Sequence, residues 1–357
     1  MQSYRWLTTI LQDSFTFELN MKKLLSFSSI FFVYLQLYAQ EPDAAQLHET
    51  ARQFMRSGDW TNAVLVLNKA LTKEPGSFAI KKDLALTYYY QRDFANAKET
   101  IKPLLDREDA DVQVFQIAGN IYKQLAESKD ADRLYKKALK KYPNAGALYA
   151  EYGELLWLEK DFNCINMWEQ GIQNDPNYSG NYYYAARHYH LTTDKVWAIV
   201  YGEIFVNMES YSSRTAEIKT MLLESYKKFF LIDPKAKPSK NVNEFTAAFT
   251  DVMNRNASVT NAGVTTETLI MLRTRFILDW YKHYGAKMPF RLFEHQRQLL
   301  QEGMFEAYNQ WIFEAALNLA SYDNWTKLNA AQYADFTRFQ KSKLFKVPAS
   351  QYYQKTN

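Results

Sequence analysis

The sequence predicts an all-α protein made of stacked helical hairpins. Small residues recur at a period of about 34 residues, and each period contains two helical segments. The first segments contribute one ladder of small residues: Ala51, Ala85, Gly119, Gly153 and Ala186. The second segments contribute another: Ala63, Ala97, Ala131, Cys164 and Ala198. Because small side chains let paired helices approach closely, we expect five hairpins, which bury their apolar stripes by stacking on one another.

Larger side chains accompany the ladders. In each first segment an apolar or aromatic residue lies three positions after the small one, on the same helix face. These residues are Phe54, Tyr88, Tyr122, Leu156 and Tyr189. The second segments repeat a pair of apolar or small residues: Leu67 with Ala70, Ile101 with Leu104, Tyr135 with Ala138, Trp168 with Gly171, and Gly202 with Phe205. Pro75, Pro143 and Pro176 close three periods, and each predicts the end of a helix.

These positions resemble the tetratricopeptide repeat family over roughly residues 44–207. The resemblance is strongest in the first and third periods: Ala51, Phe54, Ala63, Ala70 and Pro75, then Gly119, Tyr122, Ala131, Tyr135, Ala138 and Pro143. It implies an exported bacterial repeat protein with a right-handed α-solenoid of antiparallel helix pairs. It also implies that the first helices line a concave groove for a peptide or protein segment.

Two departures from the repeat predict local irregularity. Pro103 lies inside the second helix of the second period, so that helix should be short or kinked. Ala131 and Cys164 are 33 residues apart, whereas Gly119 and Gly153 are 34 apart. We therefore expect the turn between the helices of the fourth period to be one residue shorter than the others.

The N-terminal region has the pattern of a secretory signal peptide at residues 21–39. Two lysines precede an apolar run of 14 residues, Leu24–Leu37, which is shorter than the roughly 20 residues that span a bilayer as a helix. We expect export and no stable membrane span after cleavage, with an uncleaved anchor as the alternative. Residues 1–20 are interpreted as an over-extended, disordered start before Met21.

The remaining chain is expected to form three regions. Residues 40–232 should form the solenoid, with about five repeats and a degenerate sixth or capping helix. Residues 233–240, which read DPKAKPSK, suit an exposed linker. Residues 241–357 should form an aromatic-rich, all-helical domain whose first helix starts with Asn241 as its cap. This domain resembles no named family, and we expect it to pack on the end of the solenoid or against itself.

Residues suited to catalysis do not form a recognisable motif. His188 and His190 are two residues apart and point to different sides of a helix, so they do not suit a shared metal. Cys164 is the single cysteine and occupies a ladder position, which indicates a packed small residue. With no cysteine near the end of the signal to carry a lipid, we expect a periplasmic or secreted protein. We predict no catalytic residue, metal or cofactor. A pair of acidic residues that are distant in sequence and adjacent in the fold would not be visible as a sequence motif.

The resemblance also provides candidate binding residues. In tetratricopeptide first helices, the residues three before, one after and four after the small position face the groove. In this sequence the projection gives His48, Arg52, Lys82, Tyr89, Gln116, Asn120, Lys123, Glu154, Trp157, Tyr183, Arg187 and His190. We expect Trp157 and Tyr183 to be exposed anchors. The alternatives are that the set is ordinary solvated surface, or that the C-terminal helices fill the groove.

The functional prediction is a non-catalytic scaffold of the cell envelope that binds a protein or peptide partner. The net charge of +4 carries no basic block, which argues against nucleic acid as a partner. One alternative is glycan binding by rings of the C-terminal region, with Trp280, Trp311 or Trp325 stacking on sugars. A second is an enzyme whose site is assembled from the C-terminal helices. The sequence identifies neither the partner nor the oligomeric state.

Overall fold

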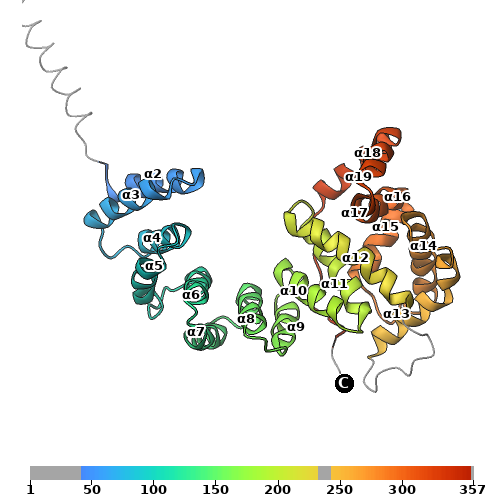
Figure 1. Cartoon of the computed structure of the whole chain (residues 1–357), viewed down its shortest axis with the longest axis horizontal. Coiled ribbons are helices and arrows are strands. Elements are labelled where there is room, and N and C mark those ends of the chain that lie inside the picture. The colour runs from blue at the N-terminus through green and yellow to red at the C-terminus, as the bar shows by residue number, and fades with distance from the viewer. Residues whose placement is uncertain (1–41, 232–242, 355–357) are drawn as a thin grey trace, which may run out of the picture. The chain divides into compact units, whose positions relative to one another are not determined.

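The computed structural model describes residues 42–231 and 243–354, and every regular element in these two ranges is helical (Figure 1). The predicted all-α class is therefore confirmed. The predicted signal segment at 21–39, the residues 1–20 before it and the linker at 233–240 lie outside the described residues.

Five helical hairpins follow one another, and the second helices of three of them end just before Pro75, Pro143 and Pro176, as predicted. They are α2 (Ala44–Ser57) with α3 (Trp60–Lys73), α4 (Phe78–Tyr90) with α5 (Phe94–Ile101), α6 (Val112–Gln124) with α7 (Ser128–Lys141), α8 (Gly146–Leu158) with α9 (Cys164–Asn174), and α10 (Ser179–Leu191) with α11 (Lys195–Met208). A single helix, α12 (Ser213–Leu231), follows the fifth hairpin.

The helices of the C-terminal region vary more in length than those of the hairpins. They are α13 (Glu244–Arg255), α14 (Thr266–His283), α15 (Arg291–Gln301), α16 (Phe305–Asn309), a π-helical turn η3 (Gln310–Glu314), α17 (Ala315–Leu317), α18 (Leu319–Leu328) and α19 (Ala330–Ser342). The cap of α13 is Asn243, whose side chain accepts a hydrogen bond from the Thr246 amide, so the prediction that Asn241 caps this helix is wrong.

The chain divides into two compact units, Met1–Thr100 and Ile101–Asn357. The first contains α2, α3, α4 and nearly all of α5. The second contains the third to fifth hairpins, α12 and the C-terminal helices. The C-terminal helices therefore share a unit with the hairpins that precede them.

The ten small residues of the two ladders are all buried, as their spacing predicts. Glycine replaces alanine where the facing side chain is largest. A Cβ atom at Gly119 would overlap Tyr135, and one at Gly153 would overlap Trp168. Because these aromatic rings come from the second helix of the same hairpin, only glycine leaves room for them.

The first helices of four hairpins end at equivalent positions. Gly58, Arg92, Ala126 and Lys160 follow at intervals of 34 residues, and each has a left-handed backbone with φ between 57° and 76°. Three of them are not glycine, and left-handed backbone disfavours residues with a Cβ. The same turn conformation therefore recurs in four hairpins, although a different residue type occupies the position in each.

Both predicted departures affect the second helices. The helix that contains Ile101 is short, because α5 ends there and Pro103 lies in a 3₁₀ turn, Lys102–Leu104. In the fourth hairpin the expected shorter turn is wrong. Cys164 is the first residue of α9, whereas the equivalent ladder residue is the fourth in α3, α5, α7 and α11. The missing residue thus removes the first turn of the helix and lengthens the connection.

Aromatic side chains join the C-terminal helices to α11 and α12. Trp197 of α11 stacks on Phe245 of α13 with ring centroids 5.3 Å apart, and Tyr226 of α12 meets Phe313 of the π-helical turn edge-on at 5.5 Å. One continuous core of buried apolar side chains extends from the fourth hairpin to Val347. The last hairpins and the C-terminal helices are therefore held together chiefly by buried apolar surface.

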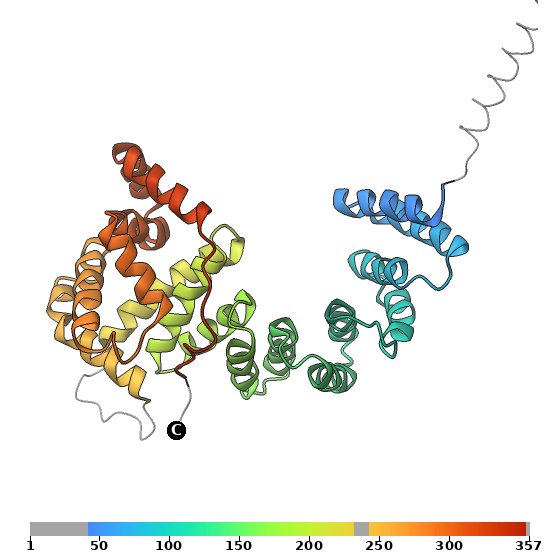
Figure 2. The ribbon, with the colours of Figure 1, turned by 180° about the vertical axis from the view of Figure 1, so that it is seen from behind.

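The chain after α19 runs back over the hairpins as an extended segment, residues 343–354 (Figure 2). The Val347 amide donates to the side chain of Asn177, and the Tyr352 hydroxyl donates to Glu169 Oε2 at 2.9 Å. Hydroxyls of Tyr189 and Tyr201 also donate to the Glu169 carboxylate, each at 2.8 Å. Three phenols from three segments thus surround one buried carboxyl group.

Glu169 should make stability depend on pH. Burial raises the pKa of Glu169 to about 7, although the three phenol donors oppose this shift. Since the folded pKa exceeds the unfolded value of 4.5, the folded state binds the proton more tightly. The stabilisation is present below about pH 4.5 and is lost as pH rises through about 7. Glu169→Gln should remove this component, on the order of 3 kcal/mol.

The measurement is urea unfolding of the wild type and of the Glu169→Gln variant at several pH values between about 4.5 and 8. The difference between their free energies of unfolding should change steadily across this range. The exposed Glu302 provides a control, because Glu302→Gln should leave the wild-type pH profile unchanged. A Glu169→Gln profile parallel to that of the wild type would contradict this account of Glu169.

Candidate functional site

An open groove of about 690 Å³ lies over α8, α10 and α12. These are the first helices of the fourth and fifth hairpins and the single helix that follows, and each packs against the next. One residue of α9, Trp168, also lines the groove. The groove is lined by Glu154, Trp157, Leu158, Trp168, Tyr184, Arg187, His188, His190, Leu191, Glu217, Thr220, Met221 and Glu224.

Four of the twelve residues projected from the repeat pattern line this groove: Glu154, Trp157, Arg187 and His190. They come from α8 and α10, one turn or less apart along each helix. The spacing of the repeat therefore brings a carboxylate, a guanidinium, an indole and an imidazole to one surface. Their role in binding stays a prediction.

Aromatic rings form the floor of the groove. The ring of Trp157 lies 6.2 Å from that of Trp168, 6.0 Å from that of His188, and edge-on to Phe162 at 6.0 Å. Trp168 in turn stacks on Tyr184 with ring centroids 5.4 Å apart. Because the rings hold one another in place, Trp157 presents a fixed apolar surface to the groove.

Tyr183 does not meet the expectation of an exposed anchor, because only 7% of its surface is accessible. Its hydroxyl donates to Glu217 of α12 at 2.7 Å, and the guanidinium groups of Arg187 and Arg214 lie over its ring. The prediction is wrong because α12 covers this position, which the projection from a single helix does not take into account.

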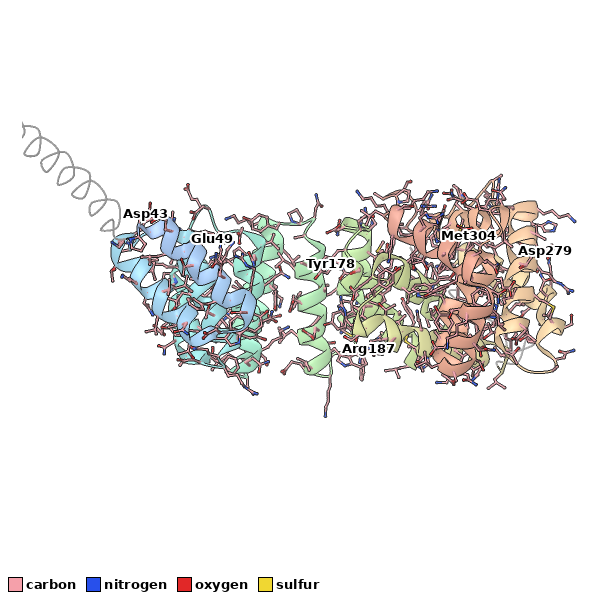
Figure 3. The ribbon with its side chains drawn as sticks, turned by 90° about the horizontal axis from the view of Figure 1, so that it is seen from above. Asp43, Glu49, Tyr178, Arg187, Asp279 and Met304 are labelled. Carbon is pink, nitrogen blue, oxygen red and sulfur yellow. The ribbon has the colours of Figure 1, made fainter. Side chains whose placement is uncertain are left out.

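Most charged groups of the groove are paired within the chain. Lys123 donates to Glu151 at 2.6 Å and also to Glu154. Burial acts to lower the pKa of Lys123, but the two carboxylates outweigh it and raise this pKa overall. The exposed guanidinium of Arg187 (Figure 3) lies 3.0 Å from Glu217. These pairs fix the positions of the polar side chains around the aromatic floor.

His190 also lines the groove, and two neighbouring side chains contact its ring. Its Nδ1 is 2.8 Å from the Ser225 hydroxyl, and its Nε2 is 3.4 Å from the Lys228 ammonium. Burial, with Lys228 and Lys195, lowers the pKa of His190 below 6.5, and burial lowers that of His188 as well. Both imidazoles are therefore neutral near pH 7.

The other projected residues lie elsewhere. In the first unit, His48 and Arg52 both contact Asp83, at 2.7 and 3.0 Å, so neighbouring first helices are joined by this carboxylate. The remaining positions are half-buried: Lys82, Tyr89, Gln116 and Asn120. The Lys82 ammonium lies 5.4 Å from the Phe78 ring, and Tyr89 packs against Tyr90 and Phe94.

Of the nine lining residues that sequence reasoning missed, four come from α12. Its role as a sixth first helix could have been read from the repeat, because Thr220 lies 34 residues after Ala186. The same offsets from Thr220 give Glu217 and Met221, and both line the groove. The signal is weak because threonine replaces the alanine or glycine of the earlier hairpins.

The C-terminal helices do not fill this groove, since all its lining residues belong to α8, α9, α10 and α12. Two of the three tryptophans considered for glycan binding are core residues, because Trp280 and Trp311 are buried. Trp325 is half-buried and its indole donates to Glu306. The alternative that rings of this region stack on sugars is therefore wrong for Trp280 and Trp311.

Cys164 is buried, and burial raises the pKa of its thiol to about 11, as expected of a packed small residue. Among residues 42–231 and 243–354, no three His, Cys, Asp or Glu side chains are grouped to hold a metal ion. Within the same ranges, none of the helices has the length and apolar character required to span a bilayer.

Comparison with known proteins finds similarity to a repeat family in one part of the chain. Residues 113–145, which cover most of α6 and all of α7, match the family model described as tetratricopeptide repeat. No curated protein shows significant sequence similarity to the chain. Among solved structures, TTC0263, a thermophilic tetratricopeptide repeat (TPR) protein of Thermus thermophilus, is 15% identical with a TM-score of 0.44, covering 50% of this chain and 99% of its own.

Two other solved structures are similar at comparable levels. A tetratricopeptide repeat protein from Parabacteroides merdae ATCC 43184 is 13% identical with a TM-score of 0.40, covering 71% of this chain and 96% of its own. YrrB, described as a TPR protein with an unusual peptide-binding site, is 16% identical with a TM-score of 0.36, covering 50% of this chain and 92% of its own. The match at 113–145 falls on the third hairpin, so this hairpin is similar to a tetratricopeptide repeat.

Proposed function

We propose that this protein is a non-catalytic scaffold that binds an extended segment of a partner protein in the groove over α8, α10 and α12. The observation that carries the proposal is the open groove itself, which has a volume of about 690 Å³ and an aromatic floor whose rings contact one another. Tetratricopeptide repeats are a scaffold for binding, and stacked repeats create surfaces of this kind.

We also propose that the protein is exported and acts in the cell envelope. The support is the sequence pattern of residues 21–39, with two lysines followed by an apolar run. Mass spectrometry of the chain expressed from Met21 in a bacterial host tests this part. A mature chain that starts at Gln40 in the periplasmic fraction would support export, and a full-length chain in the cytoplasm would refute it.

Removing exposed apolar surface from the groove should weaken peptide binding without affecting the fold. Leu158 and Leu191 line the groove and are 61% and 69% exposed. The double variant Leu158→Ala/Leu191→Ala should therefore bind a groove ligand at least about tenfold more weakly, which corresponds to about 1.4 kcal/mol. The measurement is the Kd of peptides selected from a random display library on the wild-type protein.

Two other exposed leucines provide a matched control. Leu65 of α3 and Leu278 of α14 are 63% and 65% exposed and lie outside the groove. Leu65→Ala/Leu278→Ala should leave the Kd of the same peptides unchanged. If both double variants weaken binding equally, or neither does, the peptides bind elsewhere and the proposed groove is wrong.

A further inference from the structure

The polar rim of the groove is largely neutralised by the chain itself. Glu154 is paired with Lys123, Glu217 with Arg187 at 3.0 Å, and Glu224 with Lys227 at 2.9 Å. Each carboxylate that lines the groove thus has a cationic partner within the protein. A charged side chain of a ligand would have to compete with these pairs, and it would gain little in return.

The two imidazoles of the groove add no charge near pH 7. Burial lowers the pKa of His188, and burial with Lys228 and Lys195 lowers that of His190. Next to these neutral rings lie Leu158 and Leu191, both mostly exposed, and Met221 of α12. The surface that gains most by leaving water is therefore apolar and is contributed chiefly by Leu158 of α8 and Leu191 of α10, since Met221 is already buried.

The aromatic floor is rigid and suits a large side chain. Trp157 contacts Trp168, His188 and Phe162, so its ring cannot turn without disturbing its neighbours. An apolar side chain laid against it between Leu158 and Leu191 would be desolvated on several sides. Preorganised aromatic pockets of this kind are where binding energy concentrates in protein interfaces.

From this arrangement we infer that the groove recognises its partner by one large apolar side chain in an otherwise uncharged extended segment, and not by charge. The inference rests on the proposed function and names the chemistry of the ligand. Anchors of suitable size are Phe, Trp, Leu and Met. Because no net charge has to be matched, binding should depend weakly on salt.

The test uses peptides selected from a random display library on the full chain, followed by synthetic peptides and fluorescence anisotropy. We expect the selected sequences to share one large apolar position. Replacing this anchor with alanine should weaken binding at least about tenfold. Raising NaCl from about 50 to 500 mM should change the Kd by less than about threefold, because few ionic contacts are made.

The two proposals fail in different ways. One outcome is that the selected peptides share a run of acidic or basic residues, require Leu158 and Leu191 for binding, and lose at least about tenfold in affinity when salt is raised. This outcome would overturn the apolar anchor but leave the groove as the binding site. Selected peptides that bind the Leu158→Ala/Leu191→Ala variant as well as the wild type would overturn the proposed function itself. If no peptides are enriched, both proposals are contradicted.

Discussion

Replacing Arg273 with methionine should lower the free energy of unfolding by about 3–5 kcal/mol, because it leaves a buried carboxylate without its cation. Arg273 of α14 and Glu203 of α11 form an ion pair in which both side chains are 1% exposed. Glu203 Oε1 also accepts from Gln296 at 2.6 Å and from Tyr308 at 2.8 Å, while Arg273 donates to Asn309. The pair thus joins the last hairpin to three C-terminal helices.

Urea unfolding followed by tryptophan fluorescence measures this effect. Arg338 offers a control, because it forms an exposed pair with Asp335, and Arg338→Met should cost less than about 1 kcal/mol. Adding Glu203→Gln to Arg273→Met should recover much of the loss, since the buried charge is removed while an acceptor remains for Tyr308. A loss below about 1 kcal/mol for Arg273→Met would show that the pair does not hold these elements together.

Trp280→Ala should destabilise the second unit by about 3–5 kcal/mol through the loss of a fully buried indole. The ring of Trp280 is 0% exposed and lies 4.7 Å from Phe293, 5.4 Å from Phe245 and 5.7 Å from Phe276. These contacts join α13, α14 and α15. A cavity of this size cannot close without moving all three helices.

The control variant for Trp280→Ala is a substitution on the same helix. Leu278→Ala removes an exposed side chain from α14 and should alter the free energy of unfolding by less than about 0.5 kcal/mol. Trp280→Phe should retain part of the stability, because it fills part of the cavity. A Trp280→Ala protein with wild-type stability and a lost affinity for glycans would restore the sugar-binding interpretation.

The hairpins could be predicted closely because their determinants are local and periodic. Ala63 and Ala131 mark where one helix touches its partner, and Pro75 marks where a helix has to end. Pro103 likewise predicted the short α5. Such signals depend on spacing within a hairpin. Cys164 therefore still occupies a buried ladder position, although α9 lacks its first turn. The all-α class and the helix ends before Pro75, Pro143 and Pro176 follow from them.

The candidate site was predictable only in part. Trp157 and Arg187 follow from helical position, but the burial of Tyr183 depends on side chains of α12 and could not be read from its own helix. The same holds for the pairing of Glu203 with Arg273, which are 70 residues apart. Contacts between distant segments have no period, and they decide which positions of a repeat surface remain accessible.

The most direct test of the central claim is site-specific photocrosslinking of a selected peptide. A photoreactive phenylalanine is placed at Leu191, in the groove, and in a second sample at Leu278, on α14. The account predicts a crosslinked product at Leu191 that excess unlabelled peptide abolishes, and none at Leu278. Equal crosslinking at both positions, or a product at Leu278 alone, would contradict the claim that the groove over α8, α10 and α12 is the binding site.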